Sequence, residues 1–489
     1  MEHLVHYLQK KLFLAGCFLF IATGLLFAQD KSQQIENLLS KYHEYEQFNG
    51  SVLVADNGEV IFKDGYGLAN MEHNIPNKPD TKHRLGSITK QFTAALVLQL
   101  VELGKLDLQE PISTYLPDYE GPAANVVTIH HLLTHSSGIP SYTSFPGFFR
   151  DQSRDPSSPK DFVKTFADST LQYTPGEKFL YNNSGYFLLG HIIEEVTGKT
   201  YEQVLQENIL DPLDMKDTGY DHHSRILKNR ASGYQKRGNN YENAPYLDMS
   251  LPYAAGSLYS TVEDMYKWDR SLNTNQILKE ESRDLMFRPH IAAGDSHYSY
   301  GWMIDKIPVG KTRDSVNIIG HGGGINGFNT LILRFPEEED LIVLLNNTGG
   351  TNLNEIAVGI NNILQGAEAE MPKRSLAMEI LPVFAKDGVE AGLSRYKELK
   401  ADDTYGLKEG EMNQIGYQLL QNGKTKEAIE VFKINVEEFP DSWNTYDSLG
   451  EGYMKDGQKE NAIANYQKSI EMNPDNENGK QMLEKIRAQ

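Results

Sequence analysis

The chain has 489 residues, of which 39% are hydrophobic and 23% are charged, and this composition is that of a soluble globular protein. Its length exceeds what one ordinary hydrophobic core accommodates, so two or three domains are expected. The formal net charge of −20 argues against binding to nucleic acid or to anionic lipid, because both need clustered Lys and Arg. We therefore expect no nucleic-acid partner and no membrane association beyond an N-terminal anchor.

The N-terminus has the pattern of an export signal. Two lysines precede an apolar run over residues 12–27, and Ala28 is a small residue suited to cleavage. We predict a signal peptide over residues 1–28 and an exported protein, either periplasmic or secreted. Two alternatives stay open: lipidation at Cys17, within a Leu-Ala-Gly-Cys sequence that resembles a lipoprotein processing box, and retention of the apolar run as an anchor. Cleavage removes the only cysteine, so the mature chain would have neither a disulfide nor a thiolate metal site.

Residues 29–365 are predicted to form one domain in which helices and strands mix. Residues 51–55 and 60–63 flank an Asp-Asn-Gly turn, which predicts a β-hairpin. Residues 92–103 are almost wholly apolar and are followed by a Gly-Lys stop. A helix that is apolar all round is buried, so we expect this one to run through the domain interior.

The first candidate catalytic pair lies at the start of that helix. Ser-x-x-Lys occurs at Ser87, Ser157 and Ser394, and only Ser87 precedes a buried apolar helix. Ser87 and Lys90 share one helix face, with Cβ atoms about 5–6 Å apart. A partly desolvated lysine can accept the serine proton, and the helix N-terminus directs N–H groups at a developing oxyanion. The alternative is that Ser87 caps the helix and that Lys90 is a solvated first-turn residue.

Two histidines follow at a spacing that can bind zinc. His131 and His135 are at positions i and i+4. Neither a third ligand nor a catalytic acid is evident, so we interpret them as helix-packing histidines. We expect no metal and no cofactor.

Two groups of aromatic residues could contact the substrate, but the sequence does not show whether they do. The loop over residues 141–164, with Phe145, Phe148 and Phe149, forms either a hydrophobic rim that selects acyl chains or a packed surface loop. Tyr300 and Trp302 either line the same cleft or belong to the aromatic core.

Tyr181 and Asn183 form the second candidate group, just before an apolar helix predicted over residues 186–193. The phenol of Tyr181 can carry the serine proton to the leaving group, provided that nearby Lys90 lowers its pKa. The amide of Asn183 can hold the substrate carbonyl or orient the lysine. The alternative is that residues 182–184 cap the helix, and both interpretations can hold because capping needs only one side chain.

A glycine-rich segment supplies the third candidate group, just before a core hairpin predicted over residues 330–335 and 341–345. We assign Gly323 and Gly324 to substrate and oxyanion binding. Glycines let a strand edge approach a substrate, and the amide of Gly324 could complete an oxyanion hole with that of the serine. His321 would polarise the substrate or donate to its carboxylate. The alternative is a glycine-rich loop with an incidental histidine.

Residues 411–489 have a different character, with a repeat of 34 residues. Five small, aromatic or proline positions recur in one register: Gly416 with Gly450, Gly423 with Gly457, Ala428 with Ala462, Phe432 with Tyr466, and Pro440 with Pro474. This period resembles tetratricopeptide repeats. Residues 366–410 are predicted to be a helical linker or a degenerate repeat. Two repeats are fewer than the three that usually bury a solenoid core, so we expect them to lean on the candidate catalytic domain, on the helices near Gly388, or on a second subunit.

The three motifs together resemble the serine β-lactamase and penicillin-binding-protein superfamily, specifically its class C β-lactamase-related branch. The quoted matches are Ser-Ile-Thr-Lys, Ile-His-His-Leu-Leu-Thr-His-Ser-Ser-Gly, Tyr-Asn-Asn-Ser-Gly-Tyr, Asp-Pro-Leu-Asp-Met and Gly-His-Gly-Gly. The resemblance implies an α+β fold, with a helical subdomain against a five-stranded antiparallel sheet flanked by helices, followed here by a small all-α repeat domain. By motif match, Ser87 is the nucleophile, Lys90 and Tyr181 are the acid–base pair, and Asn183 binds the substrate.

One position departs from this family pattern. His321 falls where members with lactamase activity usually carry lysine, and a mostly neutral histidine suits a substrate carboxylate less well than a fixed charge. Branch members with this pattern are typically esterases, D-amino peptidases or amidases. We therefore expect a hydrolase of a small-molecule or peptide ester or amide, with weak β-lactamase activity at most. The alternative is a catalytically silent sensor or scaffold that binds a cell-wall ligand, with residues 411–489 recruiting a protein partner or a second copy.

Overall fold

The computed structural model describes residues 30–237 and 240–487. The predicted signal peptide, Cys17 and Ala28 lie outside the described residues. Within these two ranges no helix is both long enough and apolar enough to cross a membrane. Two compact units make up the described chain: unit 1 holds residues 30–236 and 241–371, and unit 2 holds residues 372–487 with Arg237 and Asn240.

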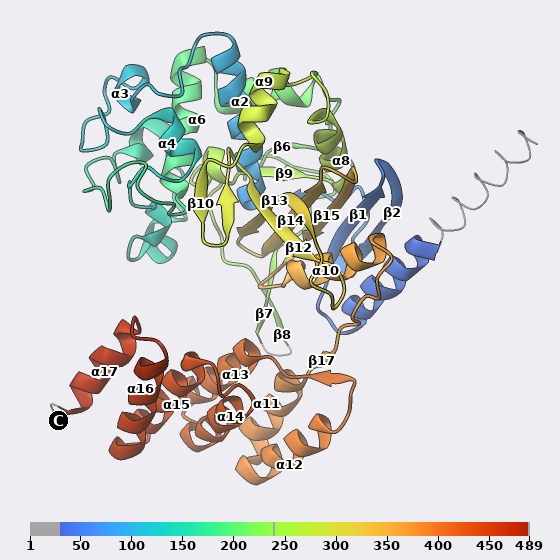
Figure 1. The fold of residues 1–489 in the computed structure, drawn as a ribbon, viewed down its shortest axis with the longest axis vertical. Helices are drawn as coiled ribbons and strands as arrows, with labels where there is room; N and C mark the ends of the chain where they lie inside the picture. Colours follow the sequence, from blue (N-terminus) through green and yellow to red (C-terminus); the bar gives the residue numbers. More distant parts are fainter. Residues whose placement is uncertain (1–29, 238–239, 488–489) are drawn as a thin grey trace, which may run out of the picture. The chain divides into compact units, whose positions relative to one another are not determined.

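An eight-stranded antiparallel sheet is the centre of unit 1, in the order β10-β11-β12-β13-β14-β15-β1-β2 (Figure 1). Its strands are β1 Gly50–Asp56, β2 Glu59–Tyr66, β10 Ile291–Ala293, β11 Ser296–Tyr298, β12 Met303–Pro308, β13 Ser315–Ile325, β14 Phe328–Phe335 and β15 Asp340–Asn346. The sheet therefore exceeds the expected five strands, because the chain before β13 folds back on itself and adds β10, β11 and β12 at one end.

Both predicted hairpins are present. Asn57 and Gly58 have positive φ angles of 50° and 81°, the conformation that a tight two-residue turn between twisted strands requires. This turn joins β1 to β2, and β14 pairs with β15 in unbroken register.

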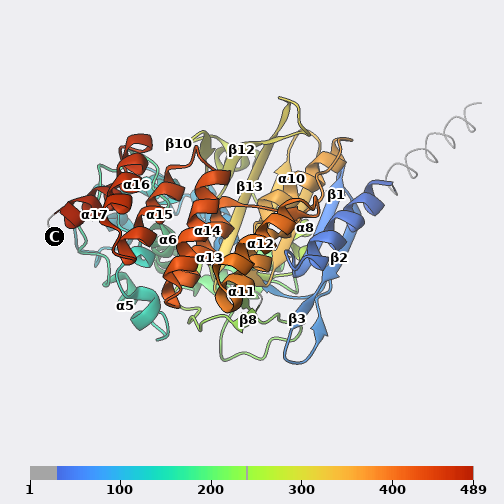
Figure 2. The same cartoon turned by 90° about the horizontal axis from the view of Figure 1, so that it is seen from below.

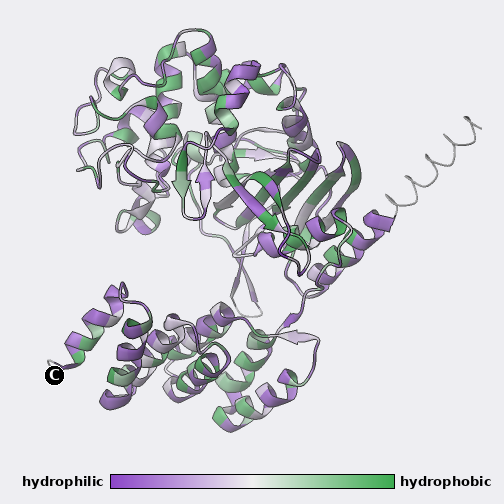
Figure 3. Ribbon diagram, viewed as in Figure 1, coloured by the Kyte–Doolittle hydropathy of each residue, from purple (hydrophilic) through white to green (hydrophobic). Residues whose placement is uncertain are grey.

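Both faces of the sheet are buried, which explains why its central strands are continuous apolar runs. Leu341, Val343 and Leu345 point into one hydrophobic core, whereas Ile342 and Leu344 point into the other. The second core is closed by the helix over residues 30–44 and by α10. Figure 3 shows the hydrophobic residues that follow the strands of this sheet.

Helices cover the first core. The helices of unit 1 after residue 44 are α2 Thr89–Glu102, α3 Ile112–Tyr115, α4 Ile129–Leu133, α5 Pro159–Val163, α6 Asn183–Thr197, α7 Tyr201–Leu205, α8 Val262–Ser271, α9 Glu280–Phe287 and α10 Leu353–Leu364. The predicted buried helix is α2, which begins three residues earlier than expected and is buried along most of its length. It ends before Gly104, whose φ of 66° suits a helix terminus.

Short strands complete the two units. They are β3 Leu68–Asn70, β4 Ile75–Pro76, β5 His83–Arg84, β6 Gly219–Tyr220, β7 Tyr234–Arg237, β8 Asn240–Asn243, β9 Leu258–Ser260, β16 Thr348–Gly349, β17 Arg374–Ser375 and β18 Tyr405–Gly406. The sheet in the order β5-β9-β6 matters for the site, because the chain leaves β5 directly into the segment that carries Ser87.

Unit 2 is a row of helix pairs that lie side by side in chain order (Figure 2). Its helices are α11 Leu376–Asp387, α12 Val389–Lys400, α13 Glu409–Gln421, α14 Thr425–Glu438, α15 Trp443–Lys455, α16 Lys459–Met472 and α17 Glu477–Arg487. The period of 34 residues has a packing cause. A Cβ at Gly416 would lie 2.3 Å from the ring of Phe432, and one at Gly450 would lie 3.2 Å from the ring of Tyr466. One hydrophobic cluster joins α11 and α12 to α13, α14 and α15, so the repeats pack on the preceding helix pair.

Candidate active site

Ser87 sits in a tight turn that is pressed against β13. The turn is the 3-10 helix η1 Gly86–Ile88, and Gly86 has a positive φ of 56°. A Cβ at Gly86 would lie 3.1 Å from the backbone nitrogen of Gly324, so only glycine lets the two segments approach this closely. Ser87 is half-buried, and helix α2 begins two residues later, at Thr89. The N-cap of α2 is Ile88 and makes no side-chain capping bond, so the interpretation of Ser87 as a cap is wrong.

The Lys90 side chain is fully buried, so the interpretation of a solvated lysine is also wrong. Its Nζ lies 3.1 Å from Ser87 Oγ, 2.9 Å from Asn183 Oδ1 and 2.8 Å from the carbonyl oxygen of Ala255. Burial holds the pKa of Lys90 well below its ordinary value of 10.5. The amide and carbonyl oxygens can only accept, so a neutral amine places both its hydrogens on them and turns its lone pair to the serine hydroxyl.

Tyr181 lies across the same amine. Lys90 Nζ is 4.9 Å from the centroid of the Tyr181 ring, and the tyrosine hydroxyl is covered without a hydrogen bond of ordinary geometry to a described residue. Burial raises the pKa of Tyr181, and the nearby Ser87 hydroxyl offsets only part of this rise. The expectation that Lys90 would lower this pKa is therefore wrong, because desolvation of the phenolate is the larger effect. Tyr181 is a protonated phenol at neutral pH and is available as an acid.

Two adjacent asparagines at the start of α6 have different roles: one caps the helix and the other contacts Lys90. Asn182 is the N-cap, and its Oδ1 accepts the backbone N–H of Gly185 at 3.0 Å. This leaves Asn183 free to turn its side-chain oxygen to Lys90 and its side-chain nitrogen to Thr143 Oγ1, at 3.2 Å. The Asn183 backbone N–H also donates to Ser141 Oγ at 3.1 Å. The cap is therefore confirmed on Asn182, and the Asn183 amide orients Lys90, whereas its contact with a substrate stays a prediction.

The glycines of β13 face the serine turn along a free strand edge. Strand β12 pairs with β13 only as far as Gly320, whereas β14 pairs with it as far as Ile325. Residues 321–325 therefore have one edge without a described strand partner. A Cβ at Gly323 would lie 1.9 Å from the carbonyl oxygen of Leu85, whereas a Cβ at Gly324 would meet nothing within 4 Å. The first glycine permits close packing, and the second leaves open space beside the turn.

His321 is buried, and the pKa of its imidazole is lowered to about 4, first by burial and then by the charge of Lys90. Its ring centroid is 6.0 Å from that of Tyr181. Its Nε2 lies 3.2 Å from the hydroxyl of Tyr298, which in turn lies 3.1 Å from Nε2 of His135. The structure thus brings all three motifs together and adds two residues.

The sequence did not identify Tyr298 and His135 as site residues. His135 follows the end of α4 at Leu133, with a positive φ of 56°, and its ring centroid lies 4.3 Å from that of Tyr181. His135 also packs against Tyr186 of α6, with ring centroids 5.0 Å apart, so the helix-packing interpretation holds but omits its place beside the candidate site. A positive φ is uncommon for a histidine, but nothing in the local sequence indicates it.

The remaining aromatic residues belong to the core. Tyr300 and Trp302 are buried in the first core, as is Phe148, which packs 5.2 Å from the ring of Tyr142. Phe149 is exposed. The loop over residues 141–164 contacts the site through the hydroxyls described above rather than through Phe148.

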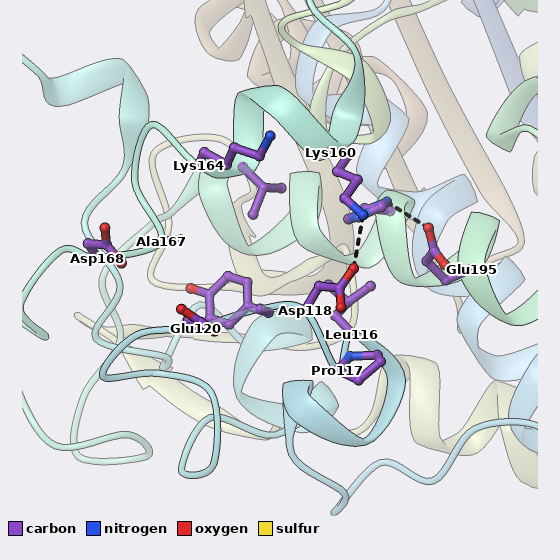
Figure 4. A pocket seen from close by; sticks show the side chains of 12 residues that line it. Leu116, Pro117, Asp118, Glu120, Lys160, Lys164, Ala167, Asp168 and Glu195 are labelled. Atoms are coloured by element: carbon purple, nitrogen blue, oxygen red, sulfur yellow. Dashed lines mark hydrogen bonds and ion pairs between the residues drawn. The ribbon is translucent and has the colours of Figure 1, made fainter.

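A cavity of about 270 Å³ lies elsewhere in unit 1 and contains none of the candidate catalytic residues (Figure 4). Its wall is highly charged, and Lys160 bridges it by donating to Asp118 at 2.9 Å. Over residues 30–237 and 240–487, no group of three or more His, Cys, Asp or Glu side chains is arranged to hold a metal ion.

The fold and the serine–lysine–tyrosine geometry define a serine hydrolase of the β-lactamase type. Residues 35–365 match the Beta-lactamase family, and the chain belongs to this family. Residues 444–476 match the Tetratricopeptide repeat family, within the helical row of unit 2.

Three relatives illustrate the range of this family. Bacillus subtilis PbpX, which is named as a penicillin-binding protein, is 31% identical over 65% of this chain and 74% of its own. The octameric penicillin-binding protein homologue from Pyrococcus abyssi is 29% identical, with a TM-score of 0.60 over 72% of this chain and 81% of that one. The D-amino acid amidase from Ochrobactrum anthropi is 27% identical, also with a TM-score of 0.60, over 69% of this chain and 99% of that one.

Proposed function

We propose that this protein is an exported hydrolase that cleaves an ester or amide bond through an acyl-enzyme on Ser87. One observation carries the proposal: the Ser87 hydroxyl lies 3.1 Å from a buried amine whose other two partners can only accept hydrogen bonds. That arrangement directs the lone pair of a neutral lysine at the serine proton, which is what activation of a serine requires.

In the acylation half, Ser87 Oγ attacks the carbonyl carbon of the substrate while its proton passes to Lys90 Nζ. The carbonyl oxygen gains the negative charge of the tetrahedral intermediate. The backbone N–H groups of Ser87 and Gly324 are the proposed donors to this oxyanion, with the packing of Gly323 holding β13 against the turn. As the carbonyl re-forms, the bond to the leaving group breaks. Tyr181 gives its proton to the departing oxygen or nitrogen and recovers one from Lys90.

In the deacylation half, water attacks the acyl carbon of the Ser87 ester. The amine–phenol pair accepts the water proton, and Ser87 Oγ leaves with a proton from the same pair. The products are a carboxylic acid and the alcohol or amine released earlier. Asn183 acts throughout by holding the amine of Lys90 with its side-chain oxygen, while its side-chain nitrogen donates to Thr143 Oγ1.

The proposed substrate class is an ester or amide without a carboxylate on the leaving-group side, including D-amino acid amides. The D-amino acid amidase among the relatives supports an amide, and the histidine at position 321 argues for weak β-lactam turnover at most. A panel of p-nitrophenyl esters, D-amino acid amides and nitrocefin separates these classes.

The test of the activity is turnover of p-nitrophenyl butyrate by the wild type and by Ser87→Ala. We expect turnover in the wild type and a rate close to that of buffer in the variant, with an unchanged circular dichroism spectrum. A folded wild-type protein that hydrolyses no member of the panel would instead favour the silent sensor or scaffold, which the repeats make the second candidate.

We further propose that the repeats of unit 2 bind a protein partner or a second copy of the chain. A protein that ends after Met371 tests this, because unit 2 begins at Pro372. A reduced oligomer size would assign the repeats to self-association, whereas an unchanged size and unchanged kinetics would assign them to an outside partner. A monomeric, fully active truncated protein whose parent shows no partner in a cross-linked cell extract would contradict both roles.

A further inference from the structure

A chain of hydrogen bonds behind the proposed site runs through three side chains and ends on the backbone at both sides. The backbone N–H of Asn182 donates to His135 Nδ1 at 3.0 Å, and His135 Nε2 lies 3.1 Å from the Tyr298 hydroxyl. The same hydroxyl lies 3.2 Å from His321 Nε2, and His321 Nδ1 lies 2.6 Å from the carbonyl oxygen of Gly322. Each ring nitrogen therefore has one partner.

The two backbone groups fix the direction of every bond in this chain. An N–H can only donate, so His135 Nδ1 accepts and the proton of the neutral ring is on Nε2. A carbonyl oxygen can only accept, so His321 carries its proton on Nδ1 and presents a lone pair at Nε2. Tyr298 then accepts from His135 and donates to His321. All donors and acceptors are satisfied only while both imidazoles are neutral.

The surroundings of His321 reinforce its neutral form. His135, Tyr298 and His321 are all buried. The titratable groups that face His321 are Lys90 from α2, Tyr181 from the segment before α6, Tyr298 from β11 and His135 from the end of α4. None of them is a carboxylate that would stabilise an imidazolium. Protonation of Nε2 would set an N–H against the proton that Tyr298 donates, so the hydroxyl would have to turn this proton away from His321.

We propose that Tyr298 is a specificity-determining residue. Anchored by His135, it locks His321 in an uncharged form, so that the site selects esters and amides without a carboxylate on the leaving-group side. This inference rests on the proposed hydrolase function. The lysine of the motif does not donate to such a carboxylate, because its amine is already held by Ser87, Asn183 and Ala255. A carboxylate placed along the free edge of β13 would then lose its hydration without gaining a cation.

The kinetic test uses two substrates that differ only in charge, 4-acetoxybenzamide and 4-acetoxybenzoate. We expect the wild type to prefer the amide, with a ratio of kcat/KM values that changes little between pH 5.5 and pH 8. Tyr298→Phe removes the donor to the neutral imidazole, so the pKa of His321 should rise toward its ordinary value. At pH 5.5 the ratio of kcat/KM for the amide to kcat/KM for the carboxylate should be about tenfold smaller in this variant than in the wild type. A tenfold change corresponds to roughly 1.4 kcal/mol.

Tyr300→Phe is the matched control. Its hydroxyl bonds to His130 Nδ1 at 2.8 Å, so the variant loses a tyrosine–histidine hydrogen bond only two residues away while the chain to His321 stays intact. We expect the ratio of this variant to equal that of the wild type. A ratio that stays unchanged in Tyr298→Phe, or that narrows equally in Tyr300→Phe, would overturn the proposal.

Nitrogen NMR of the histidine-labelled wild type tests the lock without any turnover. The His321 signals, assigned by their loss in His321→Asn, should show a neutral ring protonated on Nδ1 from pH 5.5 to pH 8. An imidazolium at neutral pH, or a proton on Nε2, would overturn the lock even if the hydrolase is active. If His321 is neutral and protonated on Nδ1 in a protein that hydrolyses no substrate, the proposed function is contradicted, whereas the proposed neutral state of His321 is confirmed.

Discussion

Lys90 lies in the protein interior with its amine in contact with three oxygen atoms, and burial removes the water that would stabilise an ammonium ion. Asn183 and Ala255 hold the amine in place, so its position does not depend on the serine. At the scale of single residues, burial therefore lowers the pKa of this lysine and favours the neutral amine that a general base requires.

Replacement of Lys90 by Arg tests whether that neutrality matters. Arginine keeps a donor near Ser87 but cannot lose its proton, so it cannot act as a base. We expect kcat/KM for p-nitrophenyl butyrate to fall by about a thousandfold, within the range that general bases contribute. Lys90→Met, which fills similar space without charge, should lose as much. An arginine variant that keeps more than about a tenth of the wild-type rate would contradict a proton-accepting role.

The pH dependence of the wild type follows from the same residue. A general base works when deprotonated, so kcat/KM should rise with pH through the lowered pKa of Lys90. It should reach its plateau well below pH 10.5, the ordinary lysine value. Stopped-flow rates across pH 5 to 10 on one neutral ester measure this profile. A kcat/KM that rises only near pH 10 would mean that burial does not lower the pKa of Lys90.

His321→Lys tests the effect of a positive charge at the third motif. A lysine there restores the cation that family members with lactamase activity usually have, so the ratio of 4-acetoxybenzoate to 4-acetoxybenzamide turnover should rise by about tenfold at pH 7. The variant also removes the acceptor of the Tyr298 hydroxyl, so its melting temperature should be compared with that of His321→Asn. A ratio at or below the wild-type value would show that charge at this position does not select the substrate.

At the scale of elements, β13 and the η1 turn act as one unit because two glycines let their backbones touch. Gly323 packs its Cα against the carbonyl of Leu85, and Gly86 packs against Gly324. From His321 onward, the other edge of β13 has no strand partner in the described part of the chain. The sequence predicted the strand and its glycines, but not that one glycine serves packing and the next leaves space.

Alanine at these two neighbouring positions should therefore have different effects on stability. Gly323→Ala would bring a methyl group against a rigid carbonyl and should lower the free energy of unfolding by ~2–3 kcal/mol. Gly324→Ala meets open space and should change it by less than ~0.5 kcal/mol. Urea denaturation of both variants measures the difference. Equal losses would contradict the close approach of β13 to the turn.

Elements whose signal is local were predicted well. The Asn-Gly turn predicted the β1–β2 hairpin. The continuous apolar runs predicted α2, β14 and β15, because an unbroken run of apolar residues indicates a buried element. Strands β10 and β11 were not predicted. They have three residues each and are partly exposed, so they lack the alternation of buried and exposed residues that marks a strand in sequence.

At the scale of the whole molecule, the candidate site depends on contacts between distant parts of the chain. The motif residues could be proposed because residue type, order and spacing carry their chemistry. His135 and Tyr298 could not, because they are 163 residues apart and their hydrogen bond exists only after folding. For the same reason, the sequence indicated the repeats through their period but left three surfaces open for their packing. The structure shows that they pack on one of these, the helix pair α11 and α12 near Gly388.

Buried histidines should make the stability of unit 1 depend on pH. Burial lowers the pKa of His83, His130 and His321 from 6.5 to about 4. Between these values the unfolded chain binds more protons, so the free energy of unfolding rises with pH from 4 to 6.5 and falls on acidification. Each histidine contributes at most ~1.4 kcal/mol per pH unit. Asp340, with a pKa raised to about 6, has the opposite sign.

Urea midpoints at pH 5 and pH 7 measure this dependence. We expect the protein to be more stable at pH 7. His83→Phe, at a buried position on β5 outside the three motifs, should reduce the difference between the two midpoints. A higher midpoint at pH 5 would show that the acidic groups dominate.

Intact-mass spectrometry after exposure to a fluorophosphonate probe tests the central claim most directly. The wild type should gain the mass of one phosphonyl group, peptide mapping should place it on Ser87, and Ser87→Ala should gain none while its fold is unchanged. An unmodified wild type, or a label on another residue that persists in Ser87→Ala, would contradict the proposed activation of this serine.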